Sequence, residues 1–206
     1  MNNFKLIILI SGNGSTLQAI INAIKHQQLH AEISAVISNR ADAYGLERAQ
    51  QANIPTQVIS HKDYPTREQF DQALQKTIDA YAPNLVVLAG FMRILTPKFV
   101  THYLGRLINI HPSLLPAYRG THTYERALAA NEQQHGTSVH YVTEELDGGP
   151  LIAQTSLPIL PEDTAETLRV RTQQLEHRFY PQVIEWIATQ QVSWCDGKVL
   201  WLNKGN

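Results

Sequence analysis

The sequence predicts an α/β protein whose central sheet is mostly parallel and is covered by helices on both faces. Short apolar runs rich in Ile, Leu and Val, such as residues 4–10 and 85–89, alternate with segments whose apolar residues recur at helical spacing, such as residues 66–81. This alternation is typical of parallel sheets, whose strands are buried on both faces and joined by crossover helices. The chain has 206 residues and no linker rich in Gly, Ser or Pro, so we expect one domain.

The individual elements follow from the same two periodicities. The expected strands are short, apolar and bounded by turn residues, and they cover residues 4–10, 33–37, 57–59, 85–89, 107–110, 137–142 and 151–157. The expected helices place apolar residues three or four positions apart, and they cover residues 15–26, 42–52, 66–81, 124–130 and 164–189. A last strand pair, near residues 192 and 199–202, is expected to finish the sheet.

Composition and charge argue against several classes of partner. The net charge of −1 gives no overall field that would attract nucleic acid or an acidic membrane surface. The apolar run at residues 6–10 is too short to span a bilayer and does not resemble a signal peptide. Cys195 is the single cysteine, so the chain forms no internal disulfide and suits a reducing compartment. We therefore expect a cytoplasmic protein that binds neither nucleic acid nor membranes.

A glycine-containing loop follows the first expected strand and opens the first expected helix, with the sequence SGNGSTLQ at residues 11–18. Gly12 and Gly14 allow a tight turn, and free N–H groups at a helix start favour an anion. A dinucleotide fingerprint would place a third glycine where Leu17 stands, and a P-loop would require a lysine. A single phosphate suits this loop better than a pyrophosphate. The alternative is a tight turn with Ser15 as the N-cap.

A second loop, AGFMRILTP at residues 89–97, is unusually apolar for the segment after a strand. Its Phe, Met, Ile and Leu side chains could line a pocket for a flat ring whose edges are recognised by backbone groups. The alternative is ordinary packing of a loop beneath the next element.

The stretch INIHPSLLP at residues 108–116 places two strong polar groups at the end of an apolar strand. Asn109 and His111 alternate with isoleucines and should project from one face. An Asn amide can donate to an oxyanion, and a His can donate to the same oxygen or move a proton. Asp147, in the turn sequence ELDGGP, would stabilise a protonated His111 if it lay nearby. The alternatives are a structural polar pair and an ordinary turn residue.

Metal and serine chemistry find no support in the sequence. The nine histidines show no ligand spacing such as H-E-x-x-H, and one cysteine cannot complete a zinc cluster. Ser113 lies outside any G-x-S-x-G elbow. We expect no metal cofactor.

Together, the motifs SGNGS, LAGFMRIL, NIHPSLLP, HGTSVH and ELDGGP closely resemble those of the phosphoribosylglycinamide formyltransferases. These are purine-synthesis enzymes that use 10-formyltetrahydrofolate, and the resemblance runs from about residue 5 to about residue 187. NIHPSLLP alone would mark only the wider formyl-transferring group. Within it, methionyl-tRNA formyltransferases carry an extra C-terminal domain for which this chain has no room, and formyltetrahydrofolate hydrolases usually carry an N-terminal regulatory domain.

The resemblance implies a Rossmann-like three-layer sandwich, the formyltransferase fold. It also implies one domain, 1–206, with a phosphate-binding half of about 1–103 and a folate-binding and catalytic half of about 104–206. The co-substrate would be 10-formyltetrahydrofolate, the substrate 5-phosphoribosylglycinamide, and the protein a monomer or weak homodimer.

The resemblance further assigns site residues by the positions that match the family's motifs. The catalytic trio would be Asn109, His111 and Asp147. Bacterial relatives often have Asn where this chain has Thr16, whose side chain reaches less far. Residues that would bind the ribonucleotide are Gly14, Ser15, Thr16, Leu17, Gln18, Gln173 and Glu176. Those that would bind the folate are Arg67, Met92, Arg93, Ile94, Leu95, Asn109, Thr143, Glu144, Glu145, Leu146 and Asp147.

The reaction so implied is transfer of a formyl group to the glycyl amine of the ribonucleotide. Three alternatives stay open on the sequence alone. One is a hydrolase or another folate-dependent formyltransferase, and a hydrolase would release formate without an amine acceptor. Another is a nucleotide-dependent oxidoreductase, against which the missing third glycine argues. The last is a binding module without catalysis, which any turnover would exclude.

Overall fold

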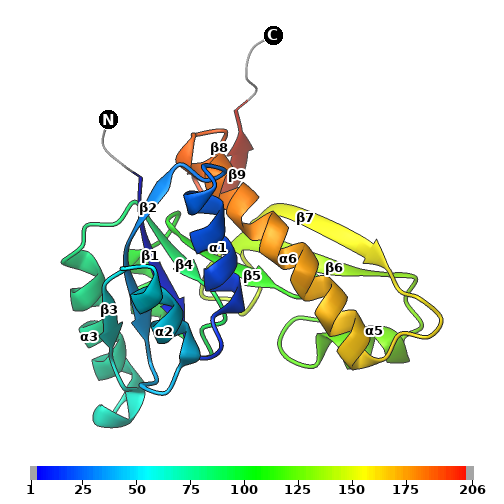
Figure 1. Cartoon of the computed structure of the whole chain (residues 1–206), viewed down its shortest axis with the longest axis horizontal. Coiled ribbons are helices and arrows are strands. Elements are labelled where there is room, and N and C mark those ends of the chain that lie inside the picture. Colours follow the sequence, from blue (N-terminus) through cyan, green and yellow to red (C-terminus); the bar gives the residue numbers. More distant parts are fainter. Residues whose placement is uncertain (1–3, 203–206) are drawn as a thin grey trace.

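The computed structural model describes residues 4–202 and contains a seven-stranded sheet in the order β3-β2-β1-β4-β5-β6-β7 (Figure 1). Strands β1 to β5 are parallel to one another, whereas β6 is antiparallel to β5 and β7 is antiparallel to β6. The seven strands are β1 (Phe4–Ile10), β2 (Ala31–Ser38), β3 (Thr56–Val58), β4 (Leu85–Leu88), β5 (Leu107–His111), β6 (Gln134–Tyr141) and β7 (Leu151–Pro158).

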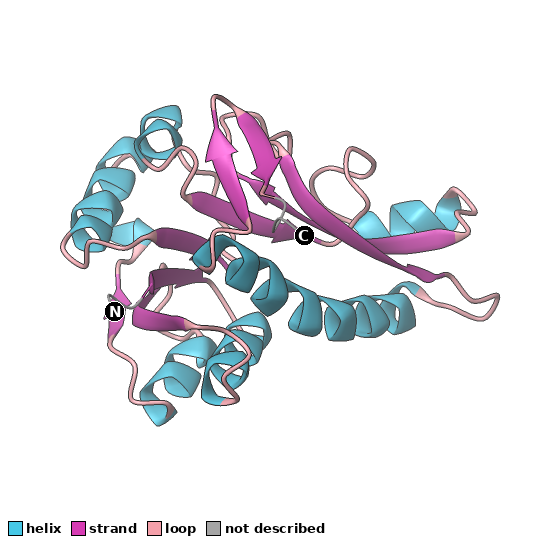
Figure 2. Ribbon diagram, turned by 90° about the horizontal axis from the view of Figure 1, so that it is seen from above, coloured by secondary structure: helices cyan, strands magenta, loops and turns pink. Residues whose placement is uncertain are grey.

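Helices pack on both faces of the sheet and make three layers (Figure 2). On one face, Leu6 and Ile8 pack with residues of α1 (Ser15–Lys25), α2 (Tyr44–Gln51) and α6 (Ala165–Ala188). On the other face, Ile7 and Leu9 pack with residues of α3 (Arg67–Asp79) and α4 (Pro97–His102). Because both faces of β1 are buried, its apolar run is continuous rather than alternating. The expected α/β class and three-layer fold are confirmed.

The expected strands and helices are all present, with ends that differ by a few residues. Two short elements were not expected, the helix α4 and the 3₁₀ helix η1 (His61–Asp63). Helix α4 has six residues, too few to show helical periodicity, although Thr96 caps it by accepting from the N–H of Phe99. Helix α5 (Thr123–Ala129) packs beside α6.

The expectation that the last strand pair finishes the central sheet was wrong. Strands β8 (Val192–Cys195) and β9 (Lys198–Trp201) form their own two-stranded sheet. Aromatic contacts fasten this hairpin to the domain, because Trp194 meets the ring of Tyr141 at 5.1 Å and Trp201 meets that of Trp186 at 5.2 Å. Side-chain packing, rather than pairing with a strand of the central sheet, therefore attaches the hairpin to the domain.

The strand directions decide where a ligand can bind. Strands β1, β4 and β5 run in parallel, so their carboxyl ends meet at one edge of the sheet, where open α/β sheets bind ligands. The sheet is continuous from β3 to β7 and therefore takes strands from both predicted halves of the chain. The functional division of those halves stays a prediction.

Candidate active site

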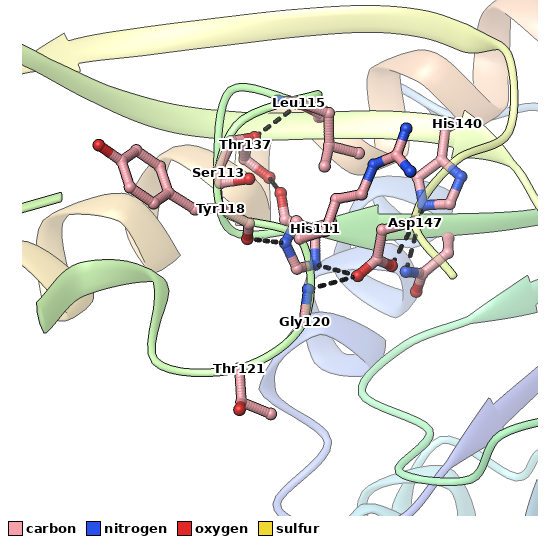
Figure 3. A network of polar contacts seen from close by, with 12 residues as sticks. His111, Ser113, Leu115, Tyr118, Gly120, Thr121, Thr137, His140 and Asp147 are labelled. Carbon is pink, nitrogen blue, oxygen red and sulfur yellow. Dashed lines mark hydrogen bonds and ion pairs between the residues drawn. The ribbon is translucent and has the colours of Figure 1, made fainter. Parts of the chain in front are cut away.

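The structure brings Asn109, His111 and Asp147 together at the end of β5. Figure 3 shows the contact between His111 and Asp147. Nδ1 of His111 lies 3.5 Å from Oδ2 of Asp147, and the two side chains are 7% and 9% exposed. Nδ2 of Asn109 lies 3.5 Å from Nε2 of His140, which in turn lies 3.8 Å from Oδ1 of Asp147. Strand alternation explains the grouping, because Asn109 and His111 project from the same face of β5.

His140 orients this group as a neutral ring. Its Nδ1 lies 2.9 Å from the carbonyl oxygen of Tyr141, which can only accept, so Nδ1 carries the proton. Burial lowers the pKa of His140, which favours the neutral form further. Its Nε2 is then an acceptor for the amide N–H of Asn109. The contact with Asp147 at 3.8 Å is therefore not an ion pair, and the Asn109 amide is turned so that its second N–H stays available.

His111 faces an acceptor on each side of its ring. Its Nε2 lies 3.0 Å from the carbonyl oxygen of Tyr118, and its Nδ1 faces the Asp147 carboxylate. Both ring nitrogens of His111 therefore face hydrogen-bond acceptors. The 3.5 Å separation from Asp147 is longer than a normal hydrogen bond, so the Nδ1–H is available to an incoming oxygen.

The turn that carries Asp147 is built for close approach. Asp147 itself has φ +48°, a left-handed conformation that Asp tolerates better than most residues. A side chain on Gly149 would place its Cβ 1.8 Å from the carbonyl oxygen of Tyr141, so only glycine fits there. The backbone N–H of Gly120 donates to Oδ2 of Asp147 at 2.9 Å and fixes the carboxylate against the 117–122 loop. Sequence, turn and loop thus hold one oxygen of Asp147 toward His111.

The glycine-containing loop opens α1 as expected. Gly14 is left-handed at φ +73°, and no side chain caps the helix. The first turn contains no acidic residue, so its N–H groups and the helix dipole can face an anion. Gln173, on α6, donates to the hydroxyl of Ser15 at 3.0 Å, whereas Gln18 donates to Asn22 of its own helix. The structure therefore joins α6 to the loop at Ser15.

Glu176 lies one turn further along α6 and is buried. Its Oε1 lies 3.2 Å from the hydroxyl of Thr137, which also donates to the carbonyl oxygen of His111 at 2.9 Å. Burial raises the pKa of Glu176 to about 7, and the Thr137 contact opposes that shift. Through Thr137, the carboxyl of Glu176 connects α6 to the end of β5.

The two loops assigned to the folate border the same group. Met92 and Ile94 are 76% and 65% exposed, and Leu146 is also exposed, which is unusual for large apolar side chains on one edge. Phe91, by contrast, is buried in the core and cannot line a pocket. The 143–147 loop is held by Glu144, which accepts from the hydroxyl of Thr101 at 3.3 Å, and by an ion pair between Glu145 and Arg119.

Arg67 and Arg93 are two further residues that the resemblance assigns to the folate. Arg67 begins α3 and is exposed, and its charge acts on Asp71 of the same helix. Arg93 has its Nε buried without a hydrogen-bond partner.

Several contacts that shape the site escaped sequence reasoning. Ser11 accepts from the N–H of Met92 at 2.8 Å and donates to Asn39 at 2.6 Å, and buried Asp71 accepts from the N–H of Thr96 at 2.6 Å. They fasten both ends of the 91–96 loop. Ser138 binds the 113–115 segment through the carbonyl of Ser113 and the N–H of Leu115. These contacts span 23 to 81 residues along the chain, so no local pattern could reveal them.

Neither a metal-binding cluster nor a membrane-spanning helix is present in residues 4–202. They contain no group of three or more His, Cys, Asp or Glu side chains that could hold a metal ion. In the same stretch of chain, no helix is long and apolar enough to cross a membrane.

Comparison with known proteins shows the family to which this chain belongs. Residues 4–184 match the formyl transferase family, and the chain belongs to it. The particular relatives are phosphoribosylglycinamide formyltransferases. The enzyme of that name from Escherichia coli is 51% identical over 201 residues, with 95% of each chain covered, and that from Haemophilus influenzae is 46% identical, with the same coverage. A solved structure of the enzyme from Coxiella burnetii is 58% identical with a TM-score of 0.93, covering 97% of this chain and 94% of its own.

Proposed function

We propose that this protein transfers the formyl group of 10-formyltetrahydrofolate to the amine of 5-phosphoribosylglycinamide, giving N-formylglycinamide ribonucleotide and tetrahydrofolate in de novo purine biosynthesis. The observation that carries the proposal is the convergence of Asn109, His111 and Asp147 at the end of β5, with α6 connected to this group through Thr137 and to the glycine-containing loop through Ser15. Relatives with that name cover nearly the whole chain, which favours the transferase over the hydrolase.

The ribonucleotide is bound at the start of α1 and along α6. The uncapped N–H groups of residues 15–17 and the Ser15 hydroxyl receive the phosphate, since a helix start favours an anion. Gln173 supports Ser15 in this position. Glu176 accepts hydrogen bonds from ribose hydroxyls. Leu17 contributes through its backbone, because its side chain is buried in the core.

The folate is bound between the 92–95 and 143–147 loops, with Arg67 at the entrance. When bound, 10-formyltetrahydrofolate supplies the formyl carbon that the glycyl amine attacks. The exposed side chains of Met92, Ile94 and Leu146 cover the pterin, and backbone groups of the loops pair with its polar edge.

The chain's main chemical task is to stabilise negative charge on the formyl oxygen. An α-amino group has a pKa of about 8, so about a tenth of it is already neutral at pH 7 and needs little activation. The free N–H of Asn109 and the Nδ1–H of His111 donate to the oxygen as its charge develops. Each such donor typically lowers the barrier by about 3–4 kcal/mol. Positioning both substrates at one edge of the sheet contributes further.

Asp147 contacts the rings of His111 and His140 and assists the transfer of the amine proton. Its Oδ2 faces Nδ1 of His111, orients that ring, and is itself fixed by the N–H of Gly120. Its Oδ1, 3.8 Å from the neutral His140, is placed to hold a water. This water would take the proton from the attacking nitrogen and pass it to N10 of the folate, as the bond between the formyl carbon and N10 breaks. Thr137 and Ser138 are less suited to this relay, because their hydroxyls already bind the carbonyls of His111 and Ser113.

The test mixes the purified protein with both substrates and follows the release of tetrahydrofolate. We expect turnover that requires the ribonucleotide. Release of formate at a comparable rate from formyl-folate alone would identify a hydrolase and overturn the proposal.

Three further assignments belong to this proposal. We place the protein in the cytoplasm, because its one cysteine suits a reducing compartment. It acts as a monomer or weak homodimer. The phosphate-binding role falls to about residues 1–103, with α6 returning to that site, and the folate-binding and catalytic role falls to about residues 104–206.

A further inference from the structure

We propose that Arg48, on α2, is a positioning residue for the ribonucleotide phosphate, because its guanidinium holds the glycine-containing loop in the shape that binds the anion. The inference rests on the proposed function and adds to it a residue from a helix that supplies no group to the assigned sites.

The guanidinium grips the loop at two residues. Its Nε donates to the carbonyl oxygen of Asn13 at 2.9 Å, and one terminal nitrogen lies 3.2 Å from the side-chain oxygen of Asn13. The other terminal nitrogen lies 3.4 Å from Oε1 of Gln18, one turn into α1. Arg48 therefore bridges the loop and the helix that the loop opens. A planar fork with several fixed donors is suited to such a bridge, whereas a lysine is not.

Helix α2 packs directly against the loop, and this packing fixes the position of the Arg48 backbone. The N–H of Gly45 donates to the carbonyl oxygen of Gly12 at 3.0 Å. A Cβ on Gly14 would lie 2.5 Å from the Cα of Gly45, so the two backbones touch. Arg48 follows Gly45 by three positions and thus shares its helix face. The ring of Tyr44 covers the guanidinium at 4.8 Å and limits its movement.

This grip has a direct consequence for the anion site. The hydrogen bond from Nε of Arg48 fixes the orientation of the Asn13 carbonyl group. The following N–H groups, at the uncapped start of α1, keep their orientation for an anion. The oxygens that Arg48 contacts are neutral, so these contacts do not cancel its charge. Burial and the charge of Arg48 lower the pKa of His177 on α6, so this charge extends toward the helix that carries Gln173.

The test compares Arg48→Ala and Arg48→Lys with Arg178→Ala. Arg178 lies on α6 and lines the same cavity of about 820 Å³ as Arg48, so its removal deletes a nearby charge without touching the loop. For Arg48→Ala we expect the KM for the ribonucleotide to rise about tenfold or more, as for loss of charged hydrogen bonds, with kcat and the KM for the folate little changed. The lysine variant keeps the charge but loses the bridge, so its KM for the ribonucleotide should lie between those of the wild type and Arg48→Ala. Arg178→Ala should change every constant by less than about twofold.

A second readout is the dissociation constant of inorganic phosphate, measured by calorimetry with each folded variant. It should weaken in parallel with the KM. An unchanged ribonucleotide KM in Arg48→Ala, or an equal rise in Arg178→Ala, overturns the inference, because the loop would then not depend on this bridge. If Arg48→Ala does not fold, Arg48→Lys decides by the same criteria. An inactive wild-type protein would refute the proposed function instead. The dissociation constant of phosphate in the variants would still test the role of Arg48.

Discussion

The hydroxyl of Thr137 lies 3.2 Å from the buried carboxyl of Glu176 while it donates to the carbonyl oxygen of His111. A hydroxyl has one proton, so it can serve only one of these two acceptors at a time. Burial raises the pKa of Glu176 to about 7, and a proton donated by Thr137 opposes that shift. Tyr124 and Tyr180 also face this carboxyl, whose charge contributes to raising the pKa of both phenols, and neither supplies a positive charge that would favour ionisation.

The stability of the protein should depend on pH through Glu176. Its folded-state pKa is about 7 and its ordinary value 4.5, so between these pH values the folded state retains a proton that the unfolded state has lost. The free energy of unfolding should therefore decrease as pH rises through this window, by up to about 3 kcal/mol. Glu176→Gln should remove this contribution. Urea denaturation at several pH values measures it, and an identical slope in both proteins would contradict the assignment.

Replacing His111 by alanine should lower kcat by about 10²–10³-fold, because the variant loses one of two donors to the developing oxyanion. Steady-state kinetics with both substrates measure the effect. The KM values should change little, since the lost contact forms mainly in the transition state. Circular dichroism checks that the fold is retained, and near-normal turnover by a folded variant would remove His111 from the mechanism.

Ser15→Ala should mainly weaken binding of the phosphorylated substrate. The variant loses a hydroxyl donor at the start of α1 and the oxygen that accepts from Gln173. We expect the ribonucleotide KM to rise about threefold to tenfold, in keeping with one hydrogen bond. Kinetics with each substrate varied in turn provide the comparison, and a fall in folate affinity alone would mean that the loop is misassigned.

Gly149→Ala should destabilise the protein by about 1–3 kcal/mol or more, because the new Cβ overlaps backbone and forces it to move. Its distance to the Tyr141 carbonyl oxygen would be 1.8 Å. Gly12→Ala is the matched control for stability, since no atom lies within 4 Å of the corresponding Cβ. Thermal unfolding of both variants should show a large shift only for Gly149, and equal shifts would show that the turn can relax.

The fold was predictable because its strands are buried on both faces and its helices are amphipathic. The apolar run of β1 and the four-residue spacing of Phe70, Leu74 and Ile78 in α3 each record one of these environments. Helix α4 was not predictable, because six residues cannot display a period, and the aromatic contacts of β8 and β9 leave no pattern in their own strands.

The site divides in the same way. Asn109 and His111 are two apart on one strand, so their common direction follows from sequence alone. The resemblance singled out Asp147, but its approach to His111 depends on a turn that only Gly149 permits. The acceptor state of His140 depends on a carbonyl and on burial, neither of which a sequence displays. Sequence thus names the candidate residues, whereas tertiary structure decides which of them lie together.

Ser11 joins the glycine-containing loop to the 92–95 loop through a single oxygen. It follows β1 at the start of the glycine-containing loop, and it accepts from the N–H of Met92 while donating to Asn39. A displacement of either loop must strain this oxygen or break one of its bonds. Any cooperativity between the two substrates can therefore pass through one side chain, and thermodynamic reciprocity requires each substrate to alter the affinity of the other by the same factor.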